Sequence, residues 1–131
     1  MSFFLDTNIL LYTLTSDTAK ADRAESLMKS GIISVQVLNE IACAMRRKFK
    51  LSWQETLGFL ALVQSFCPAE PLTIETHTRG LIVAERYGLS IYDAMIAASA
   101  LIAKCDVLYS ENMHHGLIID DQLRICNPFL Q

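Results

Sequence analysis

Short apolar runs alternate with longer amphipathic stretches along the chain, a pattern that predicts strands and helices in turn. The clearest short runs are Phe3–Leu5, residues 32–34 and Val107–Tyr109. Ile118–Ile119 and residues 123–125 are weaker strand candidates. Because short buried strands that alternate with helices form parallel sheets, we expect an α/β fold with a central parallel sheet covered on both faces.

The amphipathic stretches carry recognisable start and stop signals for helices. Ser52 and Glu55 form a capping box, in which each side chain bonds to the other residue's backbone N–H. Thr73 is positioned to cap a further helix, and Gly88 is a good helix stop. The predicted helices cover residues 18–29, 35–49, 52–63, 73–87 and 90–104.

Length and composition limit the class of protein. The chain has 131 residues, of which 52% are hydrophobic and 19% charged, so we expect one globular domain spanning residues 1–131. The longest apolar stretch, residues 94–103, falls short of the roughly 20 residues that a membrane span needs. No signal peptide is visible, and none of the four cysteines forms a C-x-x-C pair. We therefore expect a cytoplasmic protein with no membrane association and reduced thiols.

Three acidic residues stand in surroundings that make a carboxylate costly. Asp6 interrupts an apolar run with no Lys or Arg within ten residues on either side. Glu40 and Asp93 also stand among apolar residues, without an obvious cationic partner. Burying an unpaired carboxylate costs several kcal/mol unless a positive charge compensates it. One shared metal ion is the simplest source of that charge.

Net charge agrees with this interpretation without proving it. The chain has 11 Lys and Arg and 14 Asp and Glu, a net charge of −3, which is not the profile of a protein that binds nucleic acid by bulk electrostatics. Without Asp6, Glu40 and Asp93 the count is 11 acids against 11 bases, so the excess acid can belong to one site.

The topology rule for parallel sheets predicts where that site lies. Ligands bind at the carboxyl ends of the strands. Asp6 directly follows the first strand, and residues 110–112 directly follow Val107–Tyr109. Both segments should therefore meet at the same edge of the sheet.

Each acid also has a simpler interpretation. Asp6 is a suitable N-cap for a helix that starts near Asn8. Glu40 fits an ordinary solvated glutamate, since Glu is seldom buried. Asp93 forms a capping-box pattern with Ser90 before the apolar run 94–103.

Basic and imidazole side chains offer weaker signals. Arg46 and Arg47 end the helix that carries Glu40, where they can complement the helix dipole or contact phosphates beside the site. His114 and His115 fit either a surface loop or a role in proton transfer or metal binding.

Four segments together resemble the PIN-domain family, specifically the VapC-type toxins of bacterial toxin–antitoxin pairs. They are FLDTNILLY around Asp6, SVQVLNEIA around Glu40, GLSIYDAMIAASA around Asp93 and LYSENMHHG around Asn112. The closing ICNPF also looks like the end of these proteins, so the resemblance covers essentially the whole chain. It implies a three-layer α/β/α PIN-like fold around a parallel sheet.

The resemblance implies a Mg²⁺- or Mn²⁺-dependent endoribonuclease in which metal-activated water cleaves RNA. Asp6, Glu40 and Asp93 take the family's acidic positions as catalytic residues and metal ligands. The fourth acidic position falls on Asn112, a departure that removes one negative charge but leaves a carbonyl oxygen. Ser110 matches a family Ser or Thr position.

Supporting roles and partners complete the expectation. Thr7 and Asn8, with Ser110, would hydrogen-bond to the metal ligands, and Arg46 and Arg47 would contact RNA. The resemblance further implies a small antitoxin that blocks the site, and a homodimer.

Three rival functions are kept open. A non-catalytic relative that binds RNA or its antitoxin is suggested by Asn112. A phosphatase or phosphorelay domain using Asp6 would want a second acid two residues on, where Asn8 stands. A pure adaptor would carry the three acids incidentally.

Overall fold

The computed structural model describes residues 2–130, in which short strands alternate with helices as the sequence predicts. The strands are β1 (Phe3–Leu5), β2 (Ile33–Ser34), β3 (Ala69–Glu70), β4 (Val107–Tyr109), β5 (Ile118–Ile119) and β6 (Leu123–Cys126). The helices are α1 (Thr7–Leu11), the 3₁₀ turn η1 (Tyr12–Leu14), α2 (Thr18–Met28), α3 (Val35–Arg47), α4 (Trp53–Phe66), α5 (Ile74–Tyr87) and α6 (Ile91–Ile102).

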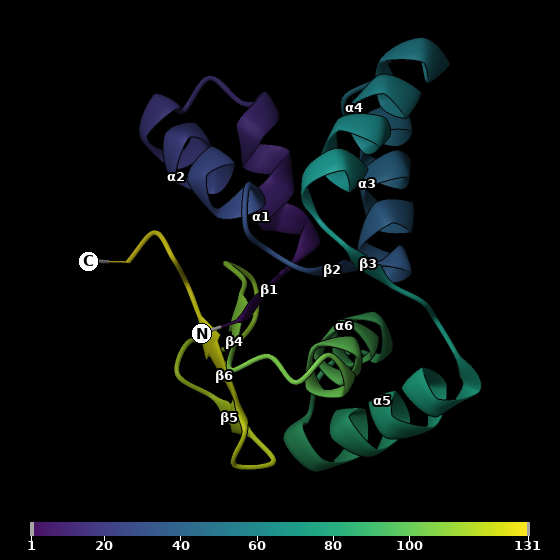
Figure 1. Ribbon diagram of the computed structural model, residues 1–131, viewed down its shortest axis with the longest axis vertical. Coiled ribbons are helices and arrows are strands. Elements are labelled where there is room, and N and C mark those ends of the chain that lie inside the picture. Colours follow the sequence, from purple (N-terminus) through teal and green to yellow (C-terminus); the bar gives the residue numbers. More distant parts are fainter. Residues whose placement is uncertain (1, 131) are drawn as a thin grey trace.

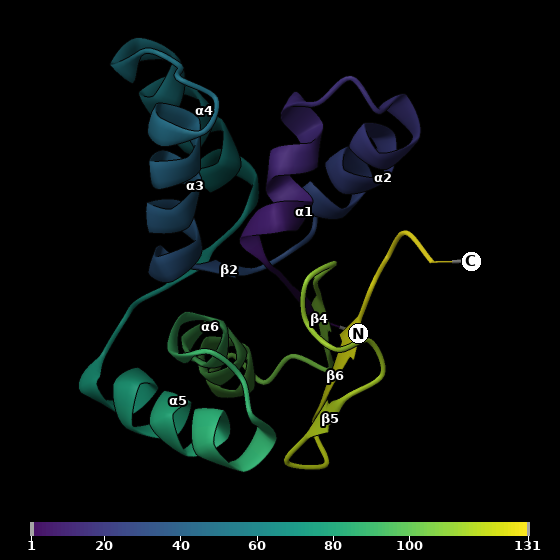
Figure 2. The same ribbon diagram turned by 180° about the vertical axis from the view of Figure 1, so that it is seen from behind.

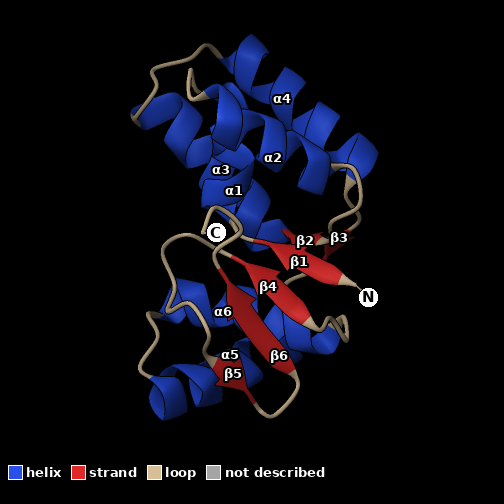
Figure 3. Ribbon diagram, turned by 90° about the vertical axis from the view of Figure 1, so that its left-hand side faces the viewer, coloured by secondary structure: helices blue, strands red, loops and turns tan. Residues whose placement is uncertain are grey.

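The strands form a central sheet that is parallel except at one edge (Figure 3). Its hydrogen-bonded order is β1-β4-β6-β5, with β1, β4 and β6 parallel and β5 antiparallel to β6. The β2–β3 pair, also parallel, continues past β1 through a bridge between Phe4 and Ile32. The predicted mixed α/β class with a central parallel sheet is confirmed, and the antiparallel edge strand is the exception.

Helices gather in two groups around this sheet, as Figures 1 and 2 show from opposite sides. One group, α1 to α4, lies beyond β1, while α5 and α6 pack together beside the other strands. Helix α6 is buried from Ala94 to Leu101, and α5 approaches it closely at Gly80, where a Cβ would come 2.5 Å from the Met95 sulfur. Over residues 2–130, no helix combines the length and apolar character needed to cross a membrane.

One face of the sheet is more open than predicted. Tyr109, Ile118 and Arg124, from β4, β5 and β6, line a surface hollow, and the Ile118 residue is 49% exposed. Strand β6 alternates buried and exposed residues, the pattern of a sheet with one solvated side. The expectation of complete cover on both faces is therefore wrong at the β5 edge.

Most predicted helix boundaries are confirmed within three residues. Both capping-box bonds between Ser52 and Glu55 are present, and Gly88 ends α5 in the left-handed conformation (φ 70°). Helix α3 stops at Arg47 rather than residue 49, because the chain turns at Lys50 with φ 53°. Helix α4 continues to Phe66, three residues beyond the prediction.

Candidate active site

Asp6 lies at the carboxyl end of β1 and is 3% exposed. Its backbone is extended (φ −78°, ψ 160°), and its side chain accepts a hydrogen bond from the Thr7 backbone N–H at 2.7 Å, so it is the N-cap of α1. The predicted cap is confirmed, although the helix starts at Thr7 rather than near Asn8. Capping occupies only Oδ1 and leaves the second carboxylate oxygen for other partners.

Neutral side chains hold that second oxygen. Ser110 Oγ donates to Asp6 Oδ2 at 2.7 Å, and Asn8 Nδ2 donates to it at 2.9 Å. Ser110 reaches Asp6 because β1 and β4 are parallel neighbours whose carboxyl ends coincide. The structure thus brings together the two segments that the strand-end rule predicted would meet.

Glu40 projects from α3 and is also held by neutral donors. Thr7 Oγ1 donates to Glu40 Oε1 at 3.0 Å, and Gln36 Nε2 donates to Oε2 at 2.9 Å. Glu40 is half-buried, and within residues 2–130 it forms no ion pair. It is therefore an ordered carboxylate rather than the ordinary solvated glutamate of the simpler interpretation.

Asp93 occupies the first turn of α6 and is half-buried. Its backbone N–H donates to Ser90 Oγ at 3.2 Å, but the reciprocal bond from its carboxylate is missing among the described contacts. The predicted capping box is thus only half formed. The Asp93 carboxylate stays available at the positive end of a helix.

The three acids influence one another electrostatically. Burial raises the pKa of the Asp6 carboxyl from its ordinary 3.8 to about 6, although the hydrogen bonds from Ser110 and Thr7 counteract it. The negative charges of Asp93 and Glu40 raise that pKa further. Both acids therefore act on Asp6 electrostatically, and within residues 2–130 none of the three forms an ion pair with a lysine or arginine.

This donor set suits a hard divalent cation. Carboxylate oxygens and waters are the ligands that Mg²⁺ and Mn²⁺ prefer. Within residues 2–130, however, no group of three or more acidic, histidine or cysteine side chains is placed so that it could hold a metal ion. The carboxylates thus supply the ligand type that the cation prefers, but the structure does not gather three of them into one binding group.

Glu111 belongs to a separate cluster that the sequence did not reveal. Lys20 Nζ forms an ion pair with Glu111 Oε2 at 2.8 Å, and the Tyr12 hydroxyl also donates to this carboxylate. Burial raises the pKa of Glu111, but these two hydrogen bonds and the Lys20 charge outweigh burial and lower it overall. Contacts between residues so distant in sequence leave no local pattern to detect.

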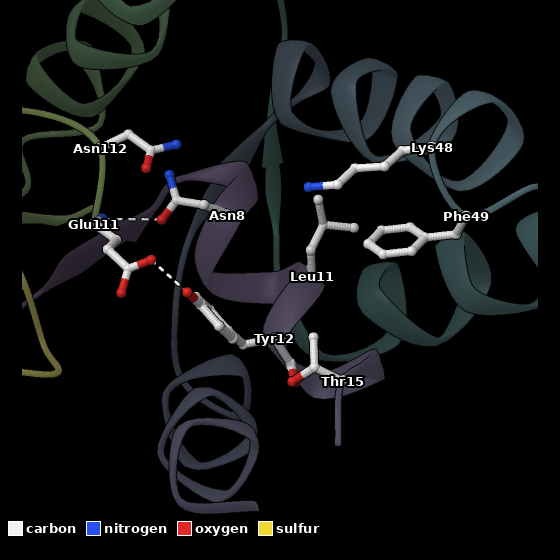
Figure 4. Close-up of a pocket in the computed structure, with 8 residues that line it drawn as sticks. All are labelled: Asn8, Leu11, Tyr12, Thr15, Lys48, Phe49, Glu111 and Asn112. Carbon is white, nitrogen blue, oxygen red and sulfur yellow. Dashed lines mark hydrogen bonds between the residues drawn. The ribbon is translucent and has the colours of Figure 1, made fainter. Parts of the chain in front are cut away.

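Asn112, the residue in place of the fourth acid, is exposed beside this cluster. Its backbone N–H donates to Ser110 Oγ at 3.2 Å, while its side chain lines a pocket of about 270 Å³ (Figure 4). The pocket lies between α1 and the end of α3, and Asn8, a hydrogen-bond partner of Asp6, is part of its lining. Its lining residues are Asn8, Leu11, Tyr12, Thr15, Lys48, Phe49, Glu111 and Asn112.

The predicted RNA-contacting arginines do not line this pocket. Arg46 donates to the Leu51 carbonyl at 2.6 Å and stacks 4.6 Å from the centre of the Trp53 ring. Arg47 is exposed on the surface. The basic residue that lines the pocket is their neighbour Lys48.

The two histidines lie in a loop. His115 Nδ1 accepts a hydrogen bond from the Asn127 backbone N–H at 2.9 Å, which ties this loop to the C-terminal segment. His114 is exposed. The loop interpretation of the pair is therefore confirmed.

Comparison with known proteins agrees with this architecture. A family model described as PIN domain matches residues 3–115. No curated protein matches the chain in sequence.

Solved structures share the fold at low identity. A toxin–antitoxin complex from Klebsiella pneumoniae matches with a TM-score of 0.73 and 20% identity, covering 98% of each chain. VapC20 of Mycobacterium tuberculosis, described as a Sarcin-Ricin loop cleaving toxin, matches with a TM-score of 0.69 and 18% identity over 85% of this chain and 90% of its own. VapBC2 from Rickettsia felis, bound to a DNA fragment from its promoter, matches with a TM-score of 0.62 and 22% identity. The match covers 86% of this chain and 89% of the Rickettsia chain.

The resemblance stated from the sequence thus has independent support. The family model spans more than half of the chain, and it includes the strand end at Asp6, the Glu40 helix, the start of α6 and the Ser110 segment. With its central parallel sheet and its acidic strand end, the chain belongs to the PIN-domain family.

Proposed function

We propose that the protein is a Mg²⁺- or Mn²⁺-dependent endoribonuclease and the toxin of a VapBC-type toxin–antitoxin pair. The main observation behind this proposal is the buried Asp6 carboxylate, whose hydrogen-bond donors are all neutral. The negative charges of Glu40 and Asp93 raise its pKa. Family membership and the description of VapC20 as a Sarcin-Ricin loop cleaving toxin support the choice of substrate class.

In this proposal each acid has a defined part. Asp6 and Asp93 would hold the divalent ion directly, and Glu40 would hold it directly or through water. When bound, the ion would lower the pKa of a coordinated water and offset charge on the attacked phosphate. Asn112 would position a water or the substrate.

Neighbouring side chains keep these groups in place. Ser110 and Asn8 fix the Asp6 carboxylate, and Thr7 fixes Glu40, so that none of them must reorganise when a cation enters. Their hydroxyl and amide groups are neutral and do not compete with the metal for charge.

Partners follow from the same family argument. We propose a small antitoxin that covers the site, since the Klebsiella relative is a toxin–antitoxin complex. We also propose that the protein is cytoplasmic, as the family resemblance implies. We propose a homodimer because α5 and α6 carry exposed apolar side chains. These include Ile74 (81% exposed), Ile82 (48%), Ile91 (56%) and Tyr92 (66%).

A second candidate function is a PIN domain that binds RNA or antitoxin without cleaving. Asn112 in place of an acid favours it, as does the lack of a closed acidic cage within the described residues. Mg²⁺ or Mn²⁺ titration separates the candidates, since the non-catalytic domain would bind neither ion.

The direct test is incubation of the purified chain with single-stranded RNA and Mn²⁺, followed by mapping of the cut ends. We expect cleavage that EDTA abolishes and that Asp93→Asn removes. Asp22→Asn, at an exposed acid on α2, is the matched control and should cut like the parent. Cleavage by Asp93→Asn at the parent rate would contradict the proposal.

A further inference from the structure

We propose that the pocket between α1 and the end of α3 is a nucleotide subsite, which binds one unpaired nucleotide of the RNA next to the bond that is cut. This inference rests on the proposed ribonuclease function and adds to it how the substrate is held. The lining of the pocket combines the aromatic ring of Phe49, the ammonium group of Lys48 and the carboxamide of Asn112 (Figure 4).

The pocket is continuous with the acidic centre through Asn8. Asn8 lines the pocket, its Nδ2 donates to Asp6 Oδ2 at 2.9 Å, and its Oδ1 accepts from the Glu111 backbone N–H at 2.9 Å. An RNA strand whose phosphate is bound near Asp6 therefore continues directly into this space. At about 270 Å³ the pocket can hold one nucleotide and is far too small for a double helix.

Phe49 supplies a stacking surface for the base. Phe49 is 37% exposed, and its ring lies beside Leu11 at the pocket wall (Figure 4). Tyr12, on the other side, is already held by Glu111 and by the edge of Phe129, with ring centres 5.0 Å apart. Tyr12 thus forms a fixed wall. The Phe49 ring has the Lys48 ammonium near it, 5.6 Å from its centre, and it is the ring that we assign to stacking on a base.

Lys48 supplies the positive charge. Its side chain extends from the end of α3 toward the side of the pocket where Asn8 and Asn112 lie (Figure 4). Within residues 2–130 it forms no ion pair, in contrast to Lys20, which is bound to Glu111. An ammonium group in this position can contact the phosphate on the far side of the bound nucleotide.

Asn112 supplies a group that can read the nucleotide. In the described chain its side-chain amide has no hydrogen-bond partner, whereas the Asn8 amide is fully engaged with Asp6 and Glu111. A free carboxamide can both donate and accept, so it can bond to a base edge or a ribose 2′-hydroxyl. A carboxylate there would repel the RNA phosphates, so the departure at residue 112 suits a substrate-binding role.

These features favour single-stranded RNA over a protein segment as the occupant. Stacking of bases on aromatic rings, with cations on the backbone and amides on base edges, is the general mode of single-strand recognition. An acidic peptide would use Lys48 alone and would gain nothing from Phe49 and Asn112 acting together.

The test measures binding of a fluorescein-labelled single-stranded oligoribonucleotide by anisotropy, in EDTA so that no cleavage occurs. We expect Phe49→Ala to weaken binding by about 10-fold, the order of one lost base stack. Lys48→Met should weaken it several-fold. Phe66→Ala, at an equally exposed phenylalanine on α4, and Lys50→Met, at a lysine outside the pocket, are the controls and should bind like the parent.

Cleavage kinetics give a second readout. In Mn²⁺ we expect Phe49→Ala and Lys48→Met to raise KM with little change in kcat, because the metal ligands are untouched. Double-stranded RNA and poly-glutamate of equal charge should compete poorly for the labelled strand. Equal competition by either, or parent-like binding by Phe49→Ala, would overturn the subsite.

The outcomes separate this inference from the proposed function. If the parent cuts RNA and both pocket variants cut it with unchanged KM, the subsite is wrong and the nuclease stands. If no protein cuts RNA while Phe49→Ala still loses single-strand binding, the subsite stands and the nuclease is wrong. Absence of RNA binding by the parent would overturn the subsite outright.

Discussion

Asn8 hydrogen-bonds to two acidic residues, Asp6 and Glu111, and only Glu111 is paired with a basic side chain. Glu111 is neutralised by Lys20 at 2.8 Å, and its pKa is lowered. Asp6 is more deeply buried, yet its partners are a backbone N–H, an amide and a hydroxyl, and its pKa is raised to about 6. The nearest lysine in sequence, Lys20, bonds to Glu111 and not to Asp6.

The difference shows which carboxylate has a negative charge that no basic side chain neutralises. An ion pair satisfies Glu111 within the chain, so it needs nothing from outside. The rise from 3.8 to about 6 corresponds to about 3 kcal/mol of instability once Asp6 is ionised, because each pKa unit is worth about 1.4 kcal/mol. The sign follows from tighter proton binding in the folded state: the penalty develops as pH rises from about 4 to about 6. A bound cation would remove it.

The largest expected effect comes from removing the unneutralised acid. Asp6→Ala should lower the rate of RNA cleavage by roughly 1,000-fold, the scale of loss for a group on which the chemistry depends. Single-turnover cleavage in Mn²⁺ measures it, with circular dichroism to show that the variant is folded. A folded Asp6→Ala variant that cuts at the parent rate would contradict the functional difference between Asp6 and Glu111.

Metal stabilisation should depend on pH. Mn²⁺ should raise Tm clearly at about pH 7.5 and much less at about pH 5, because protons compete for Asp6 below its pKa. Thermal unfolding with and without Mn²⁺ at both pH values measures the shift. Equal stabilisation at both would mean that the ion binds elsewhere.

Ser110→Ala should have an intermediate effect. It deletes a hydrogen bond that lowers the Asp6 pKa, so metal affinity should fall roughly 10-fold and the activity profile should move to higher pH. Mn²⁺ titration and the pH dependence of kcat/KM are the measurements. Ser110→Thr, which keeps the hydroxyl, should restore both if the bond to Asp6 is what matters.

The smallest effect is expected at the neutralised acid. Glu111→Gln removes the ion pair with Lys20, but the backbone N–H that Asn8 accepts is unchanged. Cleavage should stay within about threefold of the parent. Tm should fall only slightly, since ion pairs that keep contact with solvent contribute little. A loss as large as that of Asp6→Ala would show that the two carboxylates act together.

Local patterns in the sequence were sufficient to predict much of the fold and the centre of the site. The apolar run ending at Asp6, and the rule that parallel strands share a carboxyl edge, predicted the meeting with Ser110. Capping signals at Ser52 and Gly88 placed helix ends because they act within a few residues.

The features of the site that could not be predicted from the sequence depend on contacts between distant residues. The Lys20–Glu111 pair joins positions 91 apart, and no periodicity records it. Lys48 and Phe49 were predicted as helix, but the turn at Lys50 ends α3 earlier and leaves both residues beside α1. The antiparallel β5 is a two-residue strand, too short to give a directional signal.

The most direct test of the central claim is anomalous diffraction from crystals of the parent protein soaked in Mn²⁺. We expect a manganese peak coordinated by carboxylate oxygens of Asp6 and Asp93, with Glu40 bound directly or through one water, and no peak in Asp6→Asn crystals treated identically. A parent crystal with no peak among these carboxylates, in which Asp6 bonds only to Thr7, Asn8 and Ser110, would contradict the account.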